Sequence, residues 1–233
     1  MVRAVLFDFY GTLARWADAA TSNYATVFAA HGYELPDDVL DAYFERYDGV
    51  EHAAHSESKA AYEAWVRCRL GDLTSACGVH PDHEDTVIDA LRVSDQGQMV
   101  AYPEAASTLQ ALRREGLAIG VCSNWGWDLE GPLRQVGLFA LIDSPVTSAR
   151  AGARKPHPLI YAHSSTSLGV DPGEVVFVGD SWGPDVQGPR GAGMTAVHIW
   201  REGERGRQVP PVLSEGDHRI GDLTGLLGIL GHT

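Results

Sequence analysis

Polar side chains stand at the ends of three short apolar runs in the sequence. Asp8 lies near the end of the first run, and Asp180 follows the third. Ser123 and Asn124 follow the second. One polar residue in such a place is commonly a turn residue, but its recurrence after successive runs is harder to attribute to turns. Carboxylates that lie close together either bind a cation or raise one another's pKa. These positions therefore predict a polar site that carries carboxylates.

Four apolar runs are expected to form the strands that position these groups. They cover residues 4–9, 117–122, 175–178 and 195–200. Short, nearly continuous apolar runs are typical of strands buried on both faces, as in parallel sheets. Residues 103–115 and 156–168 carry apolar positions at helical spacing, and a glycine follows each. This alternation predicts an open α/β sheet, in which ligands bind at the carboxyl ends of the strands.

Residues 14–98 interrupt that alternation. The stretch is rich in Ala, aromatic and charged residues, and we expect no strand in it. Helices are expected near residues 18–31, 37–48, 57–70 and 82–92, separated by Gly and Pro. We therefore predict a helical module of residues 14–98, inserted into an α/β core made of residues 1–13 and 99–233.

The bulk composition excludes several classes of protein. The chain has 233 residues and a formal net charge of −13, which opposes non-specific binding to nucleic acid or to an anionic membrane. No stretch approaches the ~20 apolar residues of a membrane span, and the apolar run at residues 4–10 is too short for a signal peptide. Three cysteines without a metal-binding spacing indicate a reducing, cytoplasmic environment. We expect a cytoplasmic protein without nucleic-acid or membrane partners, and the oligomeric state is open.

Four short motifs resemble those of the haloacid dehalogenase superfamily and follow one another in the expected order. They are residues 7–13 (FDFYGTL), 122–124 (CSN), 154–158 (RKPHP) and 178–188 (VGDSWGPDVQG). The resemblance implies a Rossmann-like parallel-sheet core. It also implies that the helical module is an α-helical cap that closes over the active site, where a small-molecule substrate binds.

The resemblance implies a role for each polar residue of the first three motifs. Asp8 would be the nucleophile that forms a covalent ester intermediate, and Lys155 would offset the charge of the nucleophile and of the substrate. Ser123 would hold phosphate oxygens, and Thr12 would donate a hydrogen bond to Asp8 or to the bound anion. Asn124 is expected to contact the substrate as well.

Mg²⁺ is the cofactor that the resemblance implies. Asp180 would coordinate this hard cation through oxygen, and Asp8 and the backbone carbonyl of Tyr10 would supply further ligands. Asp185 would support the metal site from behind or through a water molecule.

Tyr10 departs from the usual pattern. In typical phosphatases of the superfamily, the residue two positions after the nucleophile is a second Asp, which protonates the leaving group and later deprotonates water. Tyr has an unperturbed pKa near ~10 and is a poor base at neutral pH. The first motif thus resembles that of the 2-haloacid dehalogenase branch, whose enzymes displace halide from carbon and need neither a metal nor protonation of the leaving group.

The fourth motif favours a phosphatase, because Gly-Asp-Ser-x-x-x-Asp is the phosphatase form. If Asp8, Asp180 and Asp185 converge opposite Lys155 alone, the site carries a charge of about −2, which a divalent cation satisfies and an anionic haloacid does not. The dehalogenase branch also uses a cap arginine to hold the substrate carboxylate, but Arg15 and Arg46 sit in no convincing motif.

The sequence is therefore interpreted as that of a Mg²⁺-dependent hydrolase of a small phosphorylated metabolite, with an aspartyl-phosphate on Asp8. A metal-independent 2-haloacid dehalogenase, in which Asp8 attacks carbon, is one alternative. A weakly active or non-enzymatic binding protein with the same fold is the other.

Four tryptophans adjoin the motifs: Trp16, Trp125, Trp127 and Trp182. They are expected either to pack the cap against the core or to form an aromatic mouth for an apolar or ring-containing substrate. Trp125 is the strongest candidate for substrate contact, because it follows Asn124 directly at a strand end.

Overall fold

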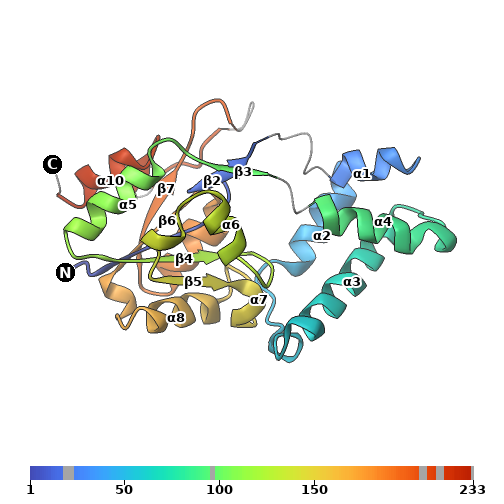
Figure 1. Cartoon of the computed structure of the whole chain (residues 1–233), viewed down its shortest axis with the longest axis horizontal. Helices are drawn as coiled ribbons and strands as arrows, with labels where there is room; N and C mark the ends of the chain where they lie inside the picture. Colours follow the sequence, from blue (N-terminus) through green and yellow to red (C-terminus); the bar gives the residue numbers. More distant parts are fainter. Residues whose placement is uncertain (18–23, 95–97, 205–208, 214–217, 232–233) are drawn as a thin grey trace.

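The computed structural model describes residues 1–17, 24–94, 98–204, 209–213 and 218–231 (Figure 1). Its core is a six-stranded sheet in the order β5-β4-β1-β6-β7-β8, and every neighbouring pair of strands is parallel. The strands are β1 (Ala4–Phe7), β4 (Ala118–Ser123), β5 (Ser144–Thr147), β6 (Val175–Gly179), β7 (Thr195–Ile199) and β8 (His218–Ile220). The predicted Rossmann-like α/β fold is confirmed.

The side chains of β1 point alternately to two hydrophobic cores, one on each face of the sheet. Val5 and Phe7 belong to the core that also contains apolar residues of α5 (Ala105–Arg114) and α10 (Thr224–Ile229). Ala4 and Leu6 belong to the core that α8 (Pro158–Ser167) covers. Both faces are therefore covered (Figure 1), which explains why the run is apolar throughout rather than alternating.

The order of the strands creates a switch point at β1. The chain passes from β1 to β4 and β5 on one side of it, and to β6, β7 and β8 on the other. Phe7 is paired with Val121 of β4 and with Val178 of β6. The carboxyl ends of β1, β4 and β6 consequently flank one crevice, which is where open α/β sheets bind ligands.

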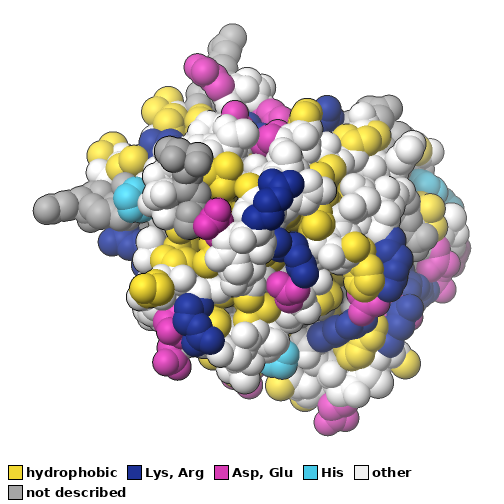
Figure 2. Space-filling view, turned by 60° about the vertical axis from the view of Figure 1, so that its left-hand side comes forward, with side chains coloured by type: hydrophobic (Ala, Val, Ile, Leu, Met, Phe, Trp, Pro, Cys, Tyr) yellow, Lys and Arg dark blue, Asp and Glu magenta, His cyan; other side chains and the backbone are white. Residues whose placement is uncertain are grey.

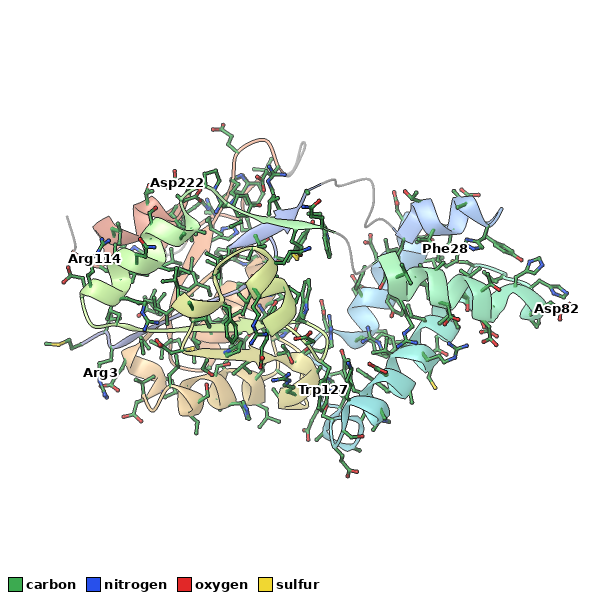
Figure 3. The ribbon with its side chains drawn as sticks, viewed as in Figure 1. Arg3, Phe28, Asp82, Arg114, Trp127 and Asp222 are labelled. Atoms are coloured by element: carbon green, nitrogen blue, oxygen red, sulfur yellow. The ribbon has the colours of Figure 1, made fainter. Side chains whose placement is uncertain are left out.

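The inserted module consists of helices, as predicted. They are α1 (Tyr24–Ala30), α2 (Asp37–Tyr47), α3 (Lys59–Ala76) and α4 (Pro81–Ser94). These helices enclose a hydrophobic core of their own, in which Phe28 is fully buried (Figure 3). Ser58 caps α3 by accepting a hydrogen bond from the Ala61 backbone N–H at 3.2 Å. The predicted helix over 18–31 overlaps α1 in its second half, and residues 18–23 lie outside the described part of the chain.

A short antiparallel ribbon joins the module to the core. β2 (Ala14–Trp16) pairs with β3 (Met99–Ala101), and Ala14 lies opposite Ala101. The expectation that residues 14–98 contain no strand was therefore wrong for β2. Three residues are too few to display a period, and their pairing partner lies far along the chain. The division of the chain at residues 14 and 98 stays a prediction.

The structure adds two edge strands that the apolar runs did not indicate. β5 contains Pro145, which argues against a strand in a sequence but is tolerated at a sheet edge. β8 begins with His218 and Arg219 and forms the opposite edge. Further short helices are α6 (Glu130–Gln135), α7 (Ser148–Ala151), α9 (Gly188–Gly191), the π-helical η4 (Trp182–Gln187) and the 3₁₀ segments η1 (Ala53–His55), η2 (Phe139–Leu141) and η3 (Pro172–Glu174).

The inserted helical module, called the cap from here on, also contacts the core through the loop that follows α2. The Gly49 N–H donates to the Lys155 carbonyl at 3.3 Å, and the Arg154 N–H donates to the Val50 carbonyl at 3.0 Å. The His52 N–H donates to the Gly152 carbonyl at 2.6 Å. Residues 49–52 thus run antiparallel to residues 152–155, and the backbone that carries Lys155 is hydrogen-bonded directly to the cap.

The surface carries charged side chains of both signs (Figure 2). On the face drawn in Figure 2, basic and acidic side chains are interspersed, without one continuous basic area among the side chains that are coloured there. Within the described segments, no helix combines the length and the apolar character that crossing a bilayer demands.

Candidate active site

The predicted carboxylates converge at the crevice beside β1. Asp8 follows β1, Asp180 follows β6, and Asp185 lies in η4. One carboxylate oxygen of each lies within 4.8 Å of the others. Asp8 and Asp185 are buried, with 7% and 1% of their surfaces exposed. Carboxylates this close either bind a cation or raise one another's pKa, because each raises the free energy of ionising the next.

Lys155 supplies one cation. Its ammonium donates to Asp8 Oδ1 at 2.8 Å and to Asp185 Oδ1 at 2.5 Å, and its side chain is 2% exposed. Burial by itself lowers the pKa of Lys155, but Asp185 and Asp8 outweigh that effect and raise it well above its ordinary value. The lysine is therefore held charged between two carboxylates.

Ser123 completes the environment of the Asp8 carboxylate. Its hydroxyl, at the end of β4, donates to Asp8 Oδ1 at 2.8 Å. Both hydrogen bonds to this carboxylate from described side chains thus reach Oδ1. Oδ2 is the oxygen that these partners leave available for attack.

Asn124 holds the backbone of Lys155. Its Oδ1 accepts from the Lys155 N–H at 2.7 Å, and its Nδ2 donates to the Lys155 carbonyl at 3.0 Å. This reciprocal pair fixes the position from which the lysine side chain enters the site. The predicted substrate contact of Asn124 stays a prediction, and the geometry favours a positioning role.

Asp185 is the most deeply buried of the three carboxylates. Burial raises its pKa to about 6, Lys155 opposes that rise, and Asp8 adds to it. Its Oδ2 accepts from the Ser181 N–H at 2.9 Å. A Cβ at Gly179 would overlap this carboxylate, so only glycine fits at the end of β6.

The backbone after Asp8 packs closely against Asp180. Gly11 has φ +82°, and a Cβ there would lie 2.7 Å from Asp180 Oδ2. Glycine meets both demands, the left-handed conformation and the close approach. The loop that contains the Tyr10 carbonyl therefore lies beside the carboxylates, where the predicted metal ligands are expected. Carboxylate and carbonyl oxygens suit a hard cation such as Mg²⁺.

Tyr10 is 46% exposed. Its ring lies 6.1 Å from that of Trp16, measured between centroids. Burial of part of the ring raises the pKa of Tyr10, and Asp180 and Glu204 raise it further. The phenol is therefore protonated at neutral pH.

Thr12 follows Gly11 in the loop after β1. It is fully buried, and its Oγ1 makes no hydrogen bond to any described residue, Asp8 included. The predicted donation to Asp8 is not found, and donation to a bound anion stays a prediction. The Thr12 carbonyl accepts from Arg201 Nη2 at 3.0 Å, which ties the first loop to the end of β7.

A cavity of about 1450 Å³ extends from the carboxylates to the cap. Trp16, Trp125 and Trp127 line it, and Trp182 does not. The Trp125 ring packs against Phe9 at 5.3 Å and donates from Nε1 to the Asp128 carbonyl at 3.1 Å. Trp127 lies at the boundary between core and cap (Figure 3). Three of the four tryptophans thus border the cavity.

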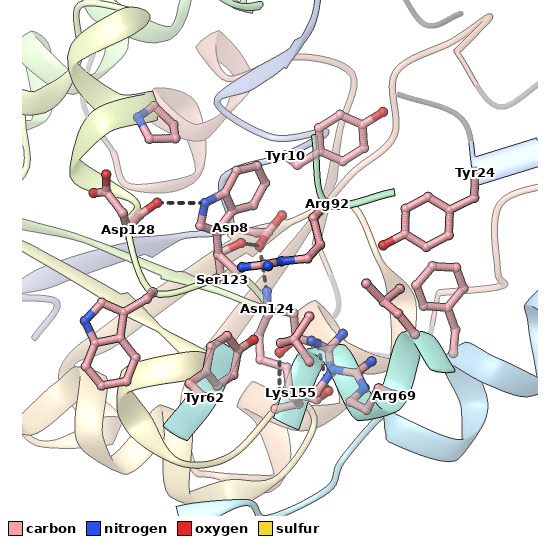
Figure 4. A pocket seen from close by; sticks show the side chains of 18 of the residues that line it. Asp8, Tyr10, Tyr24, Tyr62, Arg69, Arg92, Ser123, Asn124, Asp128 and Lys155 are labelled. Atoms are coloured by element: carbon pink, nitrogen blue, oxygen red, sulfur yellow. Dashed lines mark hydrogen bonds and ion pairs between the residues drawn. The ribbon is translucent and has the colours of Figure 1, made fainter. Parts of the chain in front are cut away.

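The cap contributes lining residues that the motifs did not identify. They include Tyr24, Tyr62, Arg69 and Arg92, four of the side chains from α1 to α4 that border the cavity with Asp8 (Figure 4). Arg15 and Arg46, the cap arginines considered from the sequence, are not among the residues that line it. Arg46 pairs instead with Asp72 at 3.2 Å on the surface. Helical spacing alone does not tell which face of each cap helix meets the core.

Comparisons with known proteins identify the family of this chain. A family model described as a haloacid dehalogenase-like hydrolase matches residues 2–193. Phosphoserine phosphatase from Thermus thermophilus is 35% identical over 186 residues, covering 79% of this chain and 71% of that protein. (S)-2-haloacid dehalogenase 4A from Burkholderia cepacia is 28% identical over 204 residues, covering 87% and 84%.

A solved structure, that of a HAD phosphatase from Thermococcus onnurineus, superimposes with a TM-score of 0.62 at 25% identity, covering 99% of this chain and 98% of that one. The fold, the four motifs and the converged carboxylates therefore lead to one assignment: this chain belongs to the haloacid dehalogenase-like hydrolase family.

Proposed function

We propose that the protein is a Mg²⁺-dependent phosphatase that hydrolyses a small phosphorylated metabolite through an aspartyl-phosphate on Asp8. One observation carries this proposal: carboxylate oxygens of Asp8, Asp180 and Asp185 lie within 4.8 Å of one another, and the Lys155 ammonium is paired with Asp8 and Asp185. If all three carboxylates are ionised, the net charge is about −2, which favours a divalent cation over a second anion.

The residues present fit Mg²⁺. Asp8, Asp180 and the Tyr10 carbonyl would hold the ion, and Asp185 would support it from behind or through water. When bound, Mg²⁺ would offset negative charge on the phosphoryl oxygens. The oxygen-only donor set and the close approach of Asp180 to the loop backbone at Gly11 support this assignment.

The chain's own groups support attack by Asp8. Lys155 and Ser123 hold Oδ1, so Oδ2 attacks phosphorus while the bond from phosphorus to the ester oxygen breaks. Water then attacks the aspartyl-phosphate, releases inorganic phosphate and restores the Asp8 carboxylate. The departing alcoholate takes its proton from solvent, since Tyr10 carries a weakly acidic phenol.

Phosphate release with and without Mg²⁺ tests the proposal. We expect the wild-type protein to release phosphate from members of a panel of phosphate monoesters in Mg²⁺, and to lose this activity in excess chelator. Asp180→Asn should weaken the response to Mg²⁺, because it removes a charged ligand. Release that is equally fast in chelator would contradict the metal requirement.

Replacing Tyr10 tests the missing proton-transfer group. We expect Tyr10→Asp to raise the rate of phosphate release by ~10²-fold or more, because a carboxylate can act as general acid and base. The side chain is 46% exposed, so the substitution should cost little stability. Tyr10→Asn is the matched control, since it has the same size as Asp without the titratable group. Equal rates for the two variants would show that Tyr10 does not limit the chemistry.

A metal-independent 2-haloacid dehalogenase is the second candidate, and Tyr10 is the observation that favours it. Such a reaction needs no proton transfer to the leaving halide. In this case Asp8 Oδ2 would attack carbon, and halide release from 2-haloacids would persist in excess chelator. Halide release that depends on Mg²⁺, or its absence, would count against this candidate.

The proposal also covers the substrate and the cellular location of the protein. The substrate is a small molecule that enters the cavity between core and cap. Cys68, Cys77 and Cys122 are all free thiols, which supports a cytoplasmic location.

A further inference from the structure

Arg69, on α3 of the cap, carries a buried positive charge. The residue is 6% exposed, and its guanidinium lies over the rings of Tyr47 and Trp65, at 4.0 and 4.7 Å from their centroids. No hydrogen bond or ion pair joins it to the described residues, and its Nε is buried without a partner. Aromatic rings offset part of the cost of burying a cation, but a buried charge is normally paired. Among the described residues, the guanidinium therefore has no counter-ion.

Arg154 brings a second guanidinium to the same region from the core. Its side chain is 13% exposed, and its Nε is also buried without a partner. The carboxylate paired with it, that of Asp48, is 3.7 Å away and 44% exposed. Burial lowers the pKa of Arg154, and the nearby positive charge of Arg69 lowers it further. Two guanidiniums therefore repel each other where one half-exposed carboxylate is available.

His52 adds a third nitrogen without a partner. It is 4% exposed and stacks on Trp65 at 4.5 Å, and its Nε2 makes no hydrogen bond to the described residues. Burial lowers the pKa of His52 to about 4, and Arg154 and Arg69 add to that effect. The imidazole is therefore neutral, and it does not relieve the unmatched positive charge.

Both guanidiniums border the cavity that holds Asp8 and Lys155. Arg69 and Arg154 line it together with Asp8, and Figure 4 shows Arg69 on the side of the cavity where Lys155 lies. The acidic end of the cavity suits a metal and a transferred group. The basic region suits an anion, and a guanidinium fork matches the oxygens of carboxylate or phosphate.

We propose that Arg69 and Arg154 form a subsite for a second anionic group of the substrate, a carboxylate or a second phosphate. The proposal rests on the proposed phosphatase function for the identity of the reacting group. It narrows the substrate class to phosphate monoesters that carry another acidic group. Arg69 is a binding residue in this scheme, and it does not touch the reacting atoms.

Matched pairs of probes test the subsite. 3-Phosphoglycerate carries a carboxylate where glycerol 3-phosphate carries a hydroxymethyl group, and fructose 1,6-bisphosphate has one phosphate more than fructose 6-phosphate. Calorimetric titration of each probe into Asp8→Asn protein, in a buffer that contains Mg²⁺, measures the Kd of the probe without turnover. We expect the member with two acidic groups, in at least one pair, to bind ~10- to 100-fold more tightly than its partner with one. The pair that shows this preference identifies the group.

Arg69→Gln in the same background should abolish most of that ratio, and Arg69→Lys should retain part of it. Because the ratio compares two ligands of one variant, general loss of affinity cancels. Arg46→Gln is the matched control, since it removes a cap guanidinium that is paired with Asp72 and lies outside the cavity lining. If Arg69→Gln fails to fold, Arg154→Gln is measured in its place.

Equal binding within both pairs, a ratio that survives the substitution, or no binding of any probe would overturn the subsite. Failure of the wild-type protein to release phosphate would overturn the proposed function instead. The binding ratios would then still decide whether the subsite exists.

Discussion

Asp8→Asn should reduce phosphate release by ~10³-fold or more, because the amide cannot form the covalent ester. The protein should nevertheless fold. Lys155 keeps its 2.5 Å ion pair with Asp185, and the substitution removes one of three crowded negative charges. The measurement is the rate of phosphate release in saturating Mg²⁺, accompanied by the melting temperature in chelator. We expect the melting temperature to stay within a few degrees of the wild-type value.

Asp128→Asn is the control for this experiment. Asp128 also lines the cavity, but it is exposed and its Oδ1 accepts from the Gly131 N–H at 3.1 Å. Its replacement should leave most of the activity. Wild-type rates in Asp8→Asn would exclude Asp8 as the nucleophile, whatever the control does.

Lys155→Met should destabilise the metal-free protein by about 3–5 kcal/mol, because it leaves Asp8 and Asp185 buried without their cation. For a chain of this length, this corresponds to a fall in melting temperature of roughly 10 °C. Mg²⁺ should raise the melting temperature of the variant, because ligands that bind only the folded state stabilise it. Thermal unfolding in chelator and in Mg²⁺ measures both effects.

Lys59→Met provides the comparison, as Lys59 is the other lysine of the chain. It is 60% exposed and lies 3.7 Å from Glu63. An exposed pair contributes at most about 1 kcal/mol, so this variant should melt close to the wild type. If both lysine variants melted alike, the buried ion pairs would contribute little to stability.

The sequence predicted the core of the fold because the buried strands carry their signal locally. The run at 175–178 is apolar at every position, and all of β6 is buried. The polar residues that follow such runs could be placed together by the geometry of parallel sheets alone. Asp8 and Asp180 met this expectation.

The rest of the site depends on contacts between distant parts of the chain. Arg69 occupies one position of a helix whose apolar residues do not mark a single face, so its direction could not be predicted. The pairing of the Asn124 amide with the Lys155 backbone joins two loops that are far apart in the sequence, so it could not be predicted either. The short β2 exists because β3 lies beside it, and local sequence carries no information on that pairing.

The backbone pairing of residues 49–52 with residues 152–155 has a consequence for protein engineering. A chimera that exchanged the cap at the β2–β3 ribbon would also replace the segment that supports the Lys155 backbone. The donor cap would have to supply a backbone segment that pairs with residues 152–155 of the recipient core. Without that pairing, Lys155 would lose part of the support of its backbone. Under the proposed function, such a graft would change substrate preference and the environment of Asp8 together, and residues 49–52 are the part of the recipient to retain.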